Sequence, residues 1–258
     1  MTTKSLSLGQ VAVPRSMVAC RLAIVLLASL AGIAPAVASD VDDFKCGPLK
    51  PPGQFGPYDY RTANKDVKEI VEIAHFSREN ELIMRGTSTT LPGPDLDYTL
   101  RAFPNHARAL KSMTDLRFRD KVNPPVGMRY TAECWFNRAL RFAPDDVQVR
   151  MVYGLFLLKS GDKKAAVEQL EIARDGGLTG GNFNYNLGLA YFQAQEYEKA
   201  REQAYKAKEM GFQLDGLKNL LTKAGQWRDP PPSPPAQPNG EAQKADEPAA
   251  QQTAAPKN

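Results

Sequence analysis

Residues 150–207 decide the fold, and they read RMVYGLFLLKSGDKKAAVEQLEIARDGGLTGGNFNYNLGLAYFQAQEYEKAREQAYKA. In this stretch the same residue classes recur at a separation of 34 positions, so that Gly154 matches Gly188 and Leu155 matches Leu189. Small residues follow the same period in two further columns, Ala132, Ala166 and Ala200, and Ala139, Ala173 and Ala207. A period of this length indicates a repeat architecture.

Each repeat contains two apolar helical faces with a turn between them. Turn residues lie within the units at 159–162 (KSGD) and 194–196 (AQE), and glycine pairs lie between the units at 176–177 and 180–181. Glycine or alanine at a helix crossing lets the two backbones approach, while large side chains fill the space beside them. The pattern therefore predicts an all-α chain built from pairs of helices.

The best-formed unit also matches a known repeat motif. Residues 184–191 (NYNLGLAY), followed by Ala200 and Ala207, resemble the tetratricopeptide repeat (TPR), a helix–turn–helix of 34 residues, although Asn184 stands where that family usually has Trp. The unit that begins at Arg150 follows the motif less closely, and a half-unit at 132–144 precedes it in the same register. The resemblance implies a right-handed solenoid of TPR-like repeats.

Upstream of residue 129 the register loosens. Residues 99–104 (TLRAFP) resemble 139–144 (ALRFAP) but lie 40 positions earlier, and we place the six extra residues in the turn around 122–125. We expect helices at 105–119 and 129–142, and an irregular first unit made of 66–85 and 95–103. At the other end, residues 214–225 predict a capping helix, because the last face of a solenoid is otherwise exposed. The helical domain is thus expected over residues 66–228.

Segments of different composition flank this domain. Residues 1–38 predict a signal peptide, with a basic front, an apolar core at 22–34 and small residues at Ala36 and Ala38; an uncleaved anchor is the alternative. Residues 39–65 are rich in Pro, Gly and aromatics and predict an extended arm that lies on the helical body. Residues 229–258 hold eight of the 20 prolines and no aromatic residue, which predicts a disordered Pro/Ala-rich tail.

Composition excludes several classes of protein. The chain of 258 residues is 42% hydrophobic and 24% charged, as is typical of soluble globular proteins. Three of the 33 basic residues and none of the 29 acidic residues precede Ser39, so the net charge from there onward is only +1. Such a near-neutral chain gives no support to a nucleic-acid partner. No second apolar run follows the leader, so we expect no integral membrane segment after signal cleavage.

Removal of the leader takes Cys20 with it and leaves Cys46 and Cys134. In an oxidising compartment two such cysteines can pair, and a bridge between them would tie the arm to the helical body. The alternative is two unpaired thiols with Cys134 in the core.

Motifs for catalysis are scarce. The sequence contains no GxSxG, HExxH, GxxxxGK[ST] or CxxC, and its histidines are His75 and His106. Cys134 and His106 could act as nucleophile and base, but Cys134 shares the apolar face of its helix. Two histidines without clustered carboxylates also argue against a metal site. We therefore expect no enzyme activity, no cofactor and no metal.

The TPR resemblance implies a ligand groove lined by the first helix of each unit. The residues that it implies are Gln148, Met151, Leu155, Leu158 and Lys159 in one unit, and Asn182, Tyr185, Leu189, Phe192 and Gln193 in the next. Some family members clamp a peptide's carboxylates with Lys and Asn at such positions, and this chain lacks that set. The groove is apolar and aromatic, and suits an apolar segment of a partner. Alternatively, the arm or the capping helix covers it.

These observations predict a non-catalytic protein–protein interaction module, a scaffold or adaptor in the bacterial envelope whose partner the sequence does not name. The leader indicates the periplasm, and secretion is the alternative. Two other functions stay open. An accessory factor of polysaccharide export or envelope assembly would use exposed Trp and Tyr as sugar platforms, and an enzyme would need a constellation of groups that the sequence does not show.

Overall fold

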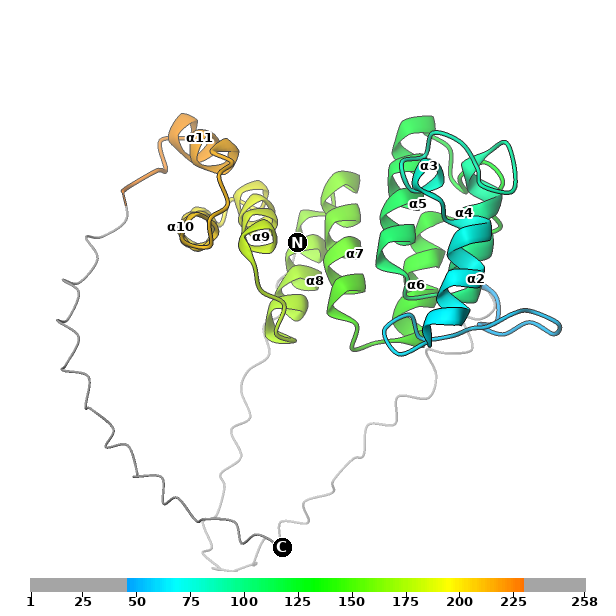
Figure 1. Ribbon diagram of the computed structural model, residues 1–258. Coiled ribbons are helices and arrows are strands. Elements are labelled where there is room, and N and C mark those ends of the chain that lie inside the picture. Colours follow the sequence, from blue (N-terminus) through cyan, green and yellow to red (C-terminus); the bar gives the residue numbers. More distant parts are fainter. Residues whose placement is uncertain (1–45, 230–258) are drawn as a thin grey trace, which may run out of the picture. The chain divides into compact units, whose positions relative to one another are not determined.

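The computed structural model describes residues 46–229, and this part of the chain is all-α (Figure 1). The expected signal peptide at 1–38, the first residues of the arm and the tail beyond Asp229 lie outside the described residues. The described part contains ten helices and no strand: α2 (Lys65–His75), α3 (Arg78–Glu81), α4 (Pro92–Ala102), α5 (Ala107–Asp120), α6 (Ala132–Phe142), α7 (Val147–Ser160), α8 (Lys163–Asp175), α9 (Gly181–Gln193), α10 (Tyr197–Glu209) and α11 (Gly216–Lys223).

The helix boundaries follow the spacing of the sequence pattern. α9 begins 34 residues after α7, and α10 begins and ends 34 residues after α8. α5 has the same length as α7 and precedes it by 40 residues, so the six extra residues fall in the 121–131 loop, as expected. α7 packs closely on α8 and α9 on α10, and each pair contacts the next (Figure 1).

Local sequence explains where these helices begin and end. Asp146 starts α7 by accepting hydrogen bonds from the backbone N–H groups of Gln148 and Val149 at 3.0 and 3.2 Å, which satisfies donors that have no partner within the helix. α7 ends at Gly161, whose φ of 93° lies in the left-handed region that glycine adopts without steric cost. Asp162 then caps α8 through the N–H of Ala165.

The repeated glycines lie where helices cross. A Cβ atom at Gly154 would lie 2.7 Å from Cγ of Leu170, and one at Gly188 would lie 2.4 Å from Cδ2 of Leu217. Real Cβ atoms essentially never come this close to another atom, so a larger residue at either position requires the facing leucine side chain to move.

Two large apolar clusters form the core. The first joins α4 to α8 and includes the fully buried side chains of Leu100, Trp135 and Phe156. The second joins α8 to α11 and includes Leu170, Leu187 and Leu217. α11 supplies Leu217 and Leu221 to this second cluster and contacts both α9 and α10.

The first unit differs from the expectation in one respect: residues 66–85 are not one helix. α2 ends at Phe76, where φ is −143°, and α3 begins after Ser77, whose Oγ accepts a hydrogen bond from the N–H of Asn80. The side chain of Phe76 is buried in the first core cluster, so the chain turns inward there instead of continuing the helix.

A disulfide links Cys46 to Cys134 on α6, with their Cα atoms 5.1 Å apart, which confirms the predicted bridge. Beside it, Arg138 of α6 is fully buried, and its Nη1 donates to the carbonyl oxygens of Cys46, Gly47 and Pro48 at 2.9 to 3.0 Å. Burial lowers the pKa of this guanidinium. The start of the described arm is thus held both covalently and by hydrogen bonds.

The rest of the arm lies across the end of α4. The N–H of Tyr58 donates to the carbonyl of Ala102 at 2.9 Å, and the N–H of Tyr60 donates to Oδ1 of Asn105 at 2.9 Å. The rings of Tyr58 and Tyr60 lie 6.2 and 5.5 Å from that of Phe103, which is fully buried. A Cβ at Gly56 would lie 2.6 Å from the Ala102 carbonyl oxygen, so glycine permits this close approach.

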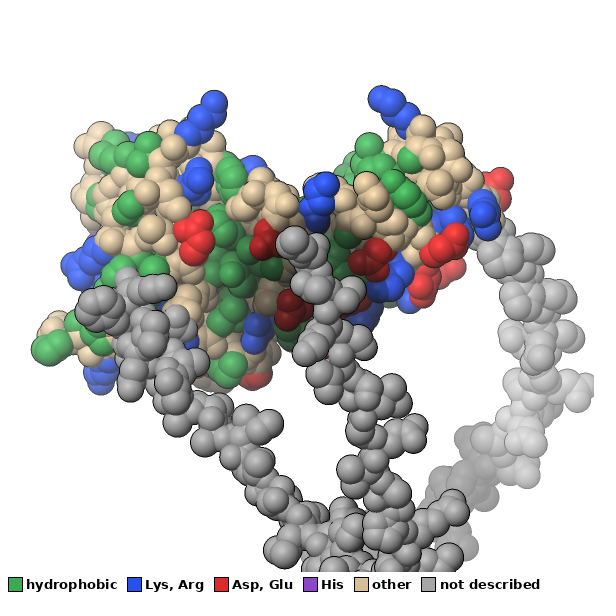
Figure 2. Space-filling view, turned by 180° about the vertical axis from the view of Figure 1, so that it is seen from behind, with side chains coloured by type: hydrophobic (Ala, Val, Ile, Leu, Met, Phe, Trp, Pro, Cys, Tyr) green, Lys and Arg blue, Asp and Glu red, His purple; other side chains and the backbone are tan. Residues whose placement is uncertain are grey.

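Hydrophobic side chains also reach the surface. Seen from the side opposite to Figure 1, they form several separate patches among acidic and basic side chains (Figure 2). Within residues 46–229, no helix combines the length and apolar character that crossing a membrane requires.

Candidate functional site

A groove runs across the first helices of three successive pairs, α5, α7 and α9. These helices contact one another in that order, and an open cavity of about 430 Å³ lies along them. Cavities of about 300–1,000 Å³ are typical of ligand-binding sites. Its lining residues fall at equivalent positions of the helices: Arg108, Gln148 and Asn182, then Lys111 and Met151, then Asp115 and Leu155. We call this surface the α5–α7–α9 groove.

Half of the groove residues expected from the sequence line this cavity: Gln148, Met151, Leu155, Lys159 and Asn182. The others lie elsewhere. Leu158 packs against both core clusters, and Leu189 and Phe192 pack against the second. Gln193 lines a separate surface cavity beside α8, together with Lys163. The groove therefore crosses α5, α7 and the first turns of α9, and does not follow α9 to its end.

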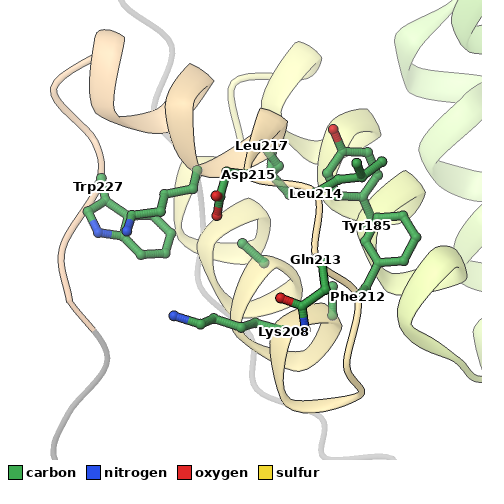
Figure 3. Close-up of a pocket in the computed structure, with 11 residues that line it drawn as sticks. Tyr185, Lys208, Phe212, Gln213, Leu214, Asp215, Leu217 and Trp227 are labelled. Carbon is green, nitrogen blue, oxygen red and sulfur yellow. The ribbon is translucent and has the colours of Figure 1, made fainter.

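Tyr185 is covered by the C-terminal segment of the described chain. Its ring lies 4.9 Å from that of Phe212, and Leu214 and Leu217 lie beside it (Figure 3). A Cβ at Gly216 would lie 2.3 Å from the Tyr185 hydroxyl oxygen, so the segment can come this close because residue 216 is glycine. This part of the expected groove is therefore occupied by the chain itself, which was one of the alternatives that the sequence left open.

The arm leaves the α5–α7–α9 groove open. Of its described residues, Tyr60 and Arg61 line a second cavity, of about 420 Å³, and none lines the groove. The two cavities share Ala107, Arg108 and Gln148, so the second one continues the groove toward the arm.

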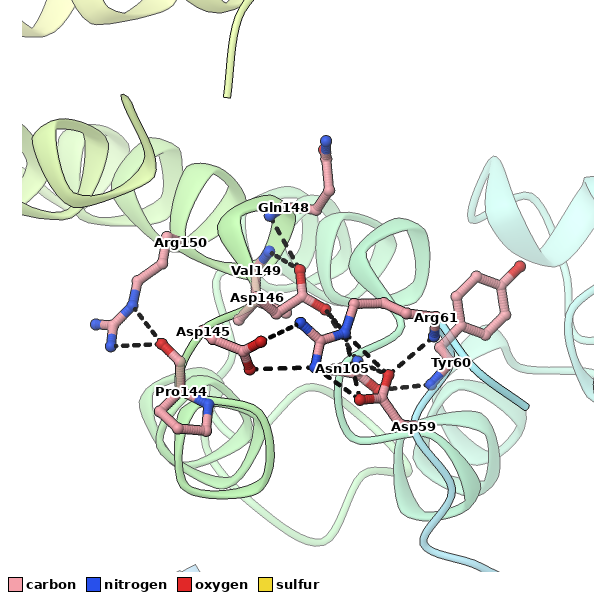
Figure 4. Close-up of polar contacts among 10 residues, drawn as sticks. All are labelled: Asp59, Tyr60, Arg61, Asn105, Pro144, Asp145, Asp146, Gln148, Val149 and Arg150. Atoms are coloured by element: carbon pink, nitrogen blue, oxygen red, sulfur yellow. Dashed lines mark hydrogen bonds and ion pairs between the residues drawn. The ribbon is translucent and has the colours of Figure 1, made fainter. Parts of the chain in front are cut away.

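Arg61 fixes the arm at this second cavity. Its guanidinium pairs with Asp145 at 2.8 Å and with Asp59 at 2.7 Å, and it lies 3.6 Å from Asp146 (Figure 4). The hydrogen bond from Arg61 lowers the pKa of Asp59 to about 2. Asn105 bridges Asp59 and Asp146 at 2.8 and 2.9 Å. These acidic groups are thus engaged in holding the arm.

Basic side chains outnumber acidic ones among the residues that line the groove. Lys111 and Lys159 share one carboxylate, that of Asp115, with Nζ–O distances of 2.7 and 3.7 Å. Arg108 is paired with Glu81 at 2.7 Å, and this hydrogen-bonded pair lowers the pKa of Glu81 to about 2. α7 and α9 contain no Asp or Glu. The groove therefore carries an excess of positive charge near Lys159.

The catalytic alternatives meet specific obstacles. Cys134 is bonded to Cys46, so its thiol cannot serve as the nucleophile that was considered. His106 is fully buried; its Nδ1 accepts from the N–H of Ala109 at 3.2 Å, and its Nε2 donates to Glu72 at 3.1 Å. Burial lowers the pKa of His106, so the neutral ring is favoured in its role as the cap of α5.

The acidic, histidine and tryptophan side chains of the described residues bear on the metal and sugar alternatives. Within 46–229, no group of three His, Cys, Asp or Glu side chains could hold a metal ion. Trp135 is buried, with 1% of its surface exposed. Trp227 is half-buried, 5.2 Å from the ring of Tyr205, with Nζ of Lys218 5.4 Å from the centre of its indole.

α5 contributes to the groove, which the 34-residue motif did not predict. Arg108, Lys111 and Asp115 lie 40 residues before Gln148, Met151 and Leu155, the same offset that relates 99–104 to 139–144. The offset was therefore sufficient to find these side chains, although the TPR motif itself does not extend so far upstream.

Comparison of the chain with protein-family models finds no match, and comparison with curated proteins finds none either. These comparisons do not assign the chain to a family. Functional inference therefore depends on the repeat spacing and on the groove.

Proposed function

We propose that this chain is a non-catalytic protein-binding module: a right-handed solenoid of TPR-like repeats, capped by α11, which holds a segment of a partner protein in the α5–α7–α9 groove. The observation that carries the proposal is the groove itself. Three equivalent helices place side chains of matching position along one open cavity, while the arm and the C-terminal segment lie beside it. A row of equivalent positions suits a ligand that is itself a polypeptide.

We place this module in the periplasm as a scaffold or adaptor of the bacterial envelope. The supporting observations are the signal-like residues 1–38 and the disulfide, which forms and persists in oxidising compartments. N-terminal sequencing of the protein from a periplasmic extract tests this, with Ser39 as the expected first residue. A chain that keeps residues 1–38 and sediments with membranes would contradict it.

Site-specific photocrosslinking in intact cells tests the binding function. A benzoylphenylalanine at Leu155 lies in the groove, whereas one at Ile172, which is 40% exposed on α8, lies outside the lining residues and serves as the control. We expect a discrete adduct from position 155 only, and we expect the further substitution Met151→Glu to abolish it. Equal adducts from both positions, or none from position 155, would refute the proposed function.

A further inference from the structure

The α5–α7–α9 groove has a distinctive combination of charge and shape. We propose that it selects an extended, acidic–aliphatic peptide, in which Asp or Glu side chains flank aliphatic ones. This inference rests on the proposed function and specifies the chemistry of the partner.

The preference for acidic residues follows from the unbalanced charges of the groove. Asp115 is the only carboxylate among the lining residues, and it already serves both Lys111 and Lys159. Lys159 is the weaker partner, at 3.7 Å, and half of its side-chain surface is exposed. A carboxylate of the ligand at this position would form a second ion pair with Lys159. A cationic side chain would instead be repelled by Lys111 and Lys159, which share the single carboxylate of Asp115.

The other charged groups that face the groove do not cancel this excess. Arg108 is neutralised by Glu81, and on the arm side Asp145 and Asp146 are held by Arg61. α9 contributes no charge at all. The excess positive charge is therefore concentrated at one end of the groove, around Lys159, whose Nζ also lies 4.6 Å from the centre of the Phe118 ring.

The floor of the groove explains the aliphatic part of the preference. Met151, Val152 and Leu155 are half-buried along α7, so a ligand that covers them removes apolar surface from water. None of these side chains is aromatic, and their flexible or branched shapes suit Leu, Ile or Val in the ligand.

The rim of the groove favours an extended ligand. Gln148, Asn182 and Asn186 place amide side chains beside the apolar floor, and the amide of Asn186 donates to the carbonyl and side-chain oxygens of Asn182 at 2.8 and 3.1 Å. Amides both donate and accept hydrogen bonds, so they can pair with the N–H and C=O groups of an extended backbone. A helical ligand would present no such unpaired groups along its length.

Selection from a random dodecapeptide phage library tests the inference. The purified full chain is the target. Leu155→Trp, which fills the groove without adding a charge, identifies groove-independent binders, and Lys159→Glu reverses the charge at the proposed position. Lys164→Glu is the matched control, since Lys164 is an exposed lysine of α8 that lines another cavity. Thermal unfolding followed by circular dichroism verifies that each variant folds, and Asn182→Trp replaces Leu155→Trp if the latter does not.

We expect the peptides that bind the natural chain and not Leu155→Trp to be rich in Asp, Glu, Leu, Ile and Val. By fluorescence anisotropy, the best synthetic peptide should lose at least about tenfold in affinity on Lys159→Glu and less than about twofold on Lys164→Glu. Groove-dependent peptides that are neutral or basic would overturn this inference and leave the proposed function standing. Recovery of only groove-independent peptides would overturn both.

Discussion

Removal of the Cys46–Cys134 disulfide gives the most quantitative test of how the arm is held. The double variant Cys46→Ala and Cys134→Ala deletes the bridge without leaving a thiol at either position. The bridge closes a loop with a sequence separation of 88, and chain entropy assigns about 4.5 kcal/mol of stabilisation to a loop of that size. Since whole domains are stable by about 5–15 kcal/mol, this is a large fraction of the total.

Urea unfolding monitored by circular dichroism at 222 nm measures the change. With a urea dependence of about 2–3 kcal/mol/M, the midpoint should fall by roughly 2 M. The natural chain in excess dithiothreitol is the control and should unfold at the midpoint of the double variant. A difference of less than about 0.5 M between the natural chain and the double variant would refute the loop-closure reasoning. It would mean that Arg138 and the aromatic contacts hold the arm just as well in the absence of the bridge.

Two further predictions concern the helix crossing at Gly188 and the buried histidine. Gly188→Val should lower the free energy of unfolding in urea by about 1–3 kcal/mol, because a Cβ at this position would lie 2.4 Å from Cδ2 of Leu217. The control Gln193→Val, at an exposed position, should lower it by less than about 0.5 kcal/mol. Equal losses would contradict the crossing geometry. Burial lowers the pKa of His106 below 6.5, so the unfolded chain binds the proton more readily and the stability should fall as the pH drops below about 6.5. The pKa of Glu72 is also lowered, chiefly by the hydrogen bond with His106, and this adds a second loss of stability below about 4.5. His106→Asn, which can still cap α5, should flatten the loss between pH 7.5 and 5, and an unchanged slope would contradict the assignment.

Much of the helical body could be predicted because it is encoded locally. The 34-residue period predicts α7 to α10 closely, since the turns after α7 and α8 contain glycines and the helix crossings contain small residues, as at Gly154 and Gly188. The disulfide could also be predicted, because once Cys20 is set aside with the expected leader, Cys46 and Cys134 have only each other as an intramolecular partner.

The path of non-repeated segments could not be predicted in the same way. The break between α2 and α3 depends on the burial of Phe76 among residues of α4 and α5, which no local pattern reveals. The covering of Tyr185 depends on Gly216, a residue 31 positions later that reads as an ordinary helix start. Both features arise from contacts between distant segments.

The placement of the arm bears directly on the proposed function. An arm of aromatic residues attached to a helical body could have filled the groove as a ligand does, but its contacts lie elsewhere. Tyr58 and Tyr60 pack on Phe103, Arg61 pairs with Asp145, and the bridge attaches Cys46 to α6. Phe103 belongs to a small cluster with Val71 and Ala102 that is separate from the two large ones, so the arm completes the core of the irregular first unit. The irregular end is therefore covered by the arm and the regular end by α11, and the apolar floor between them stays accessible to a partner.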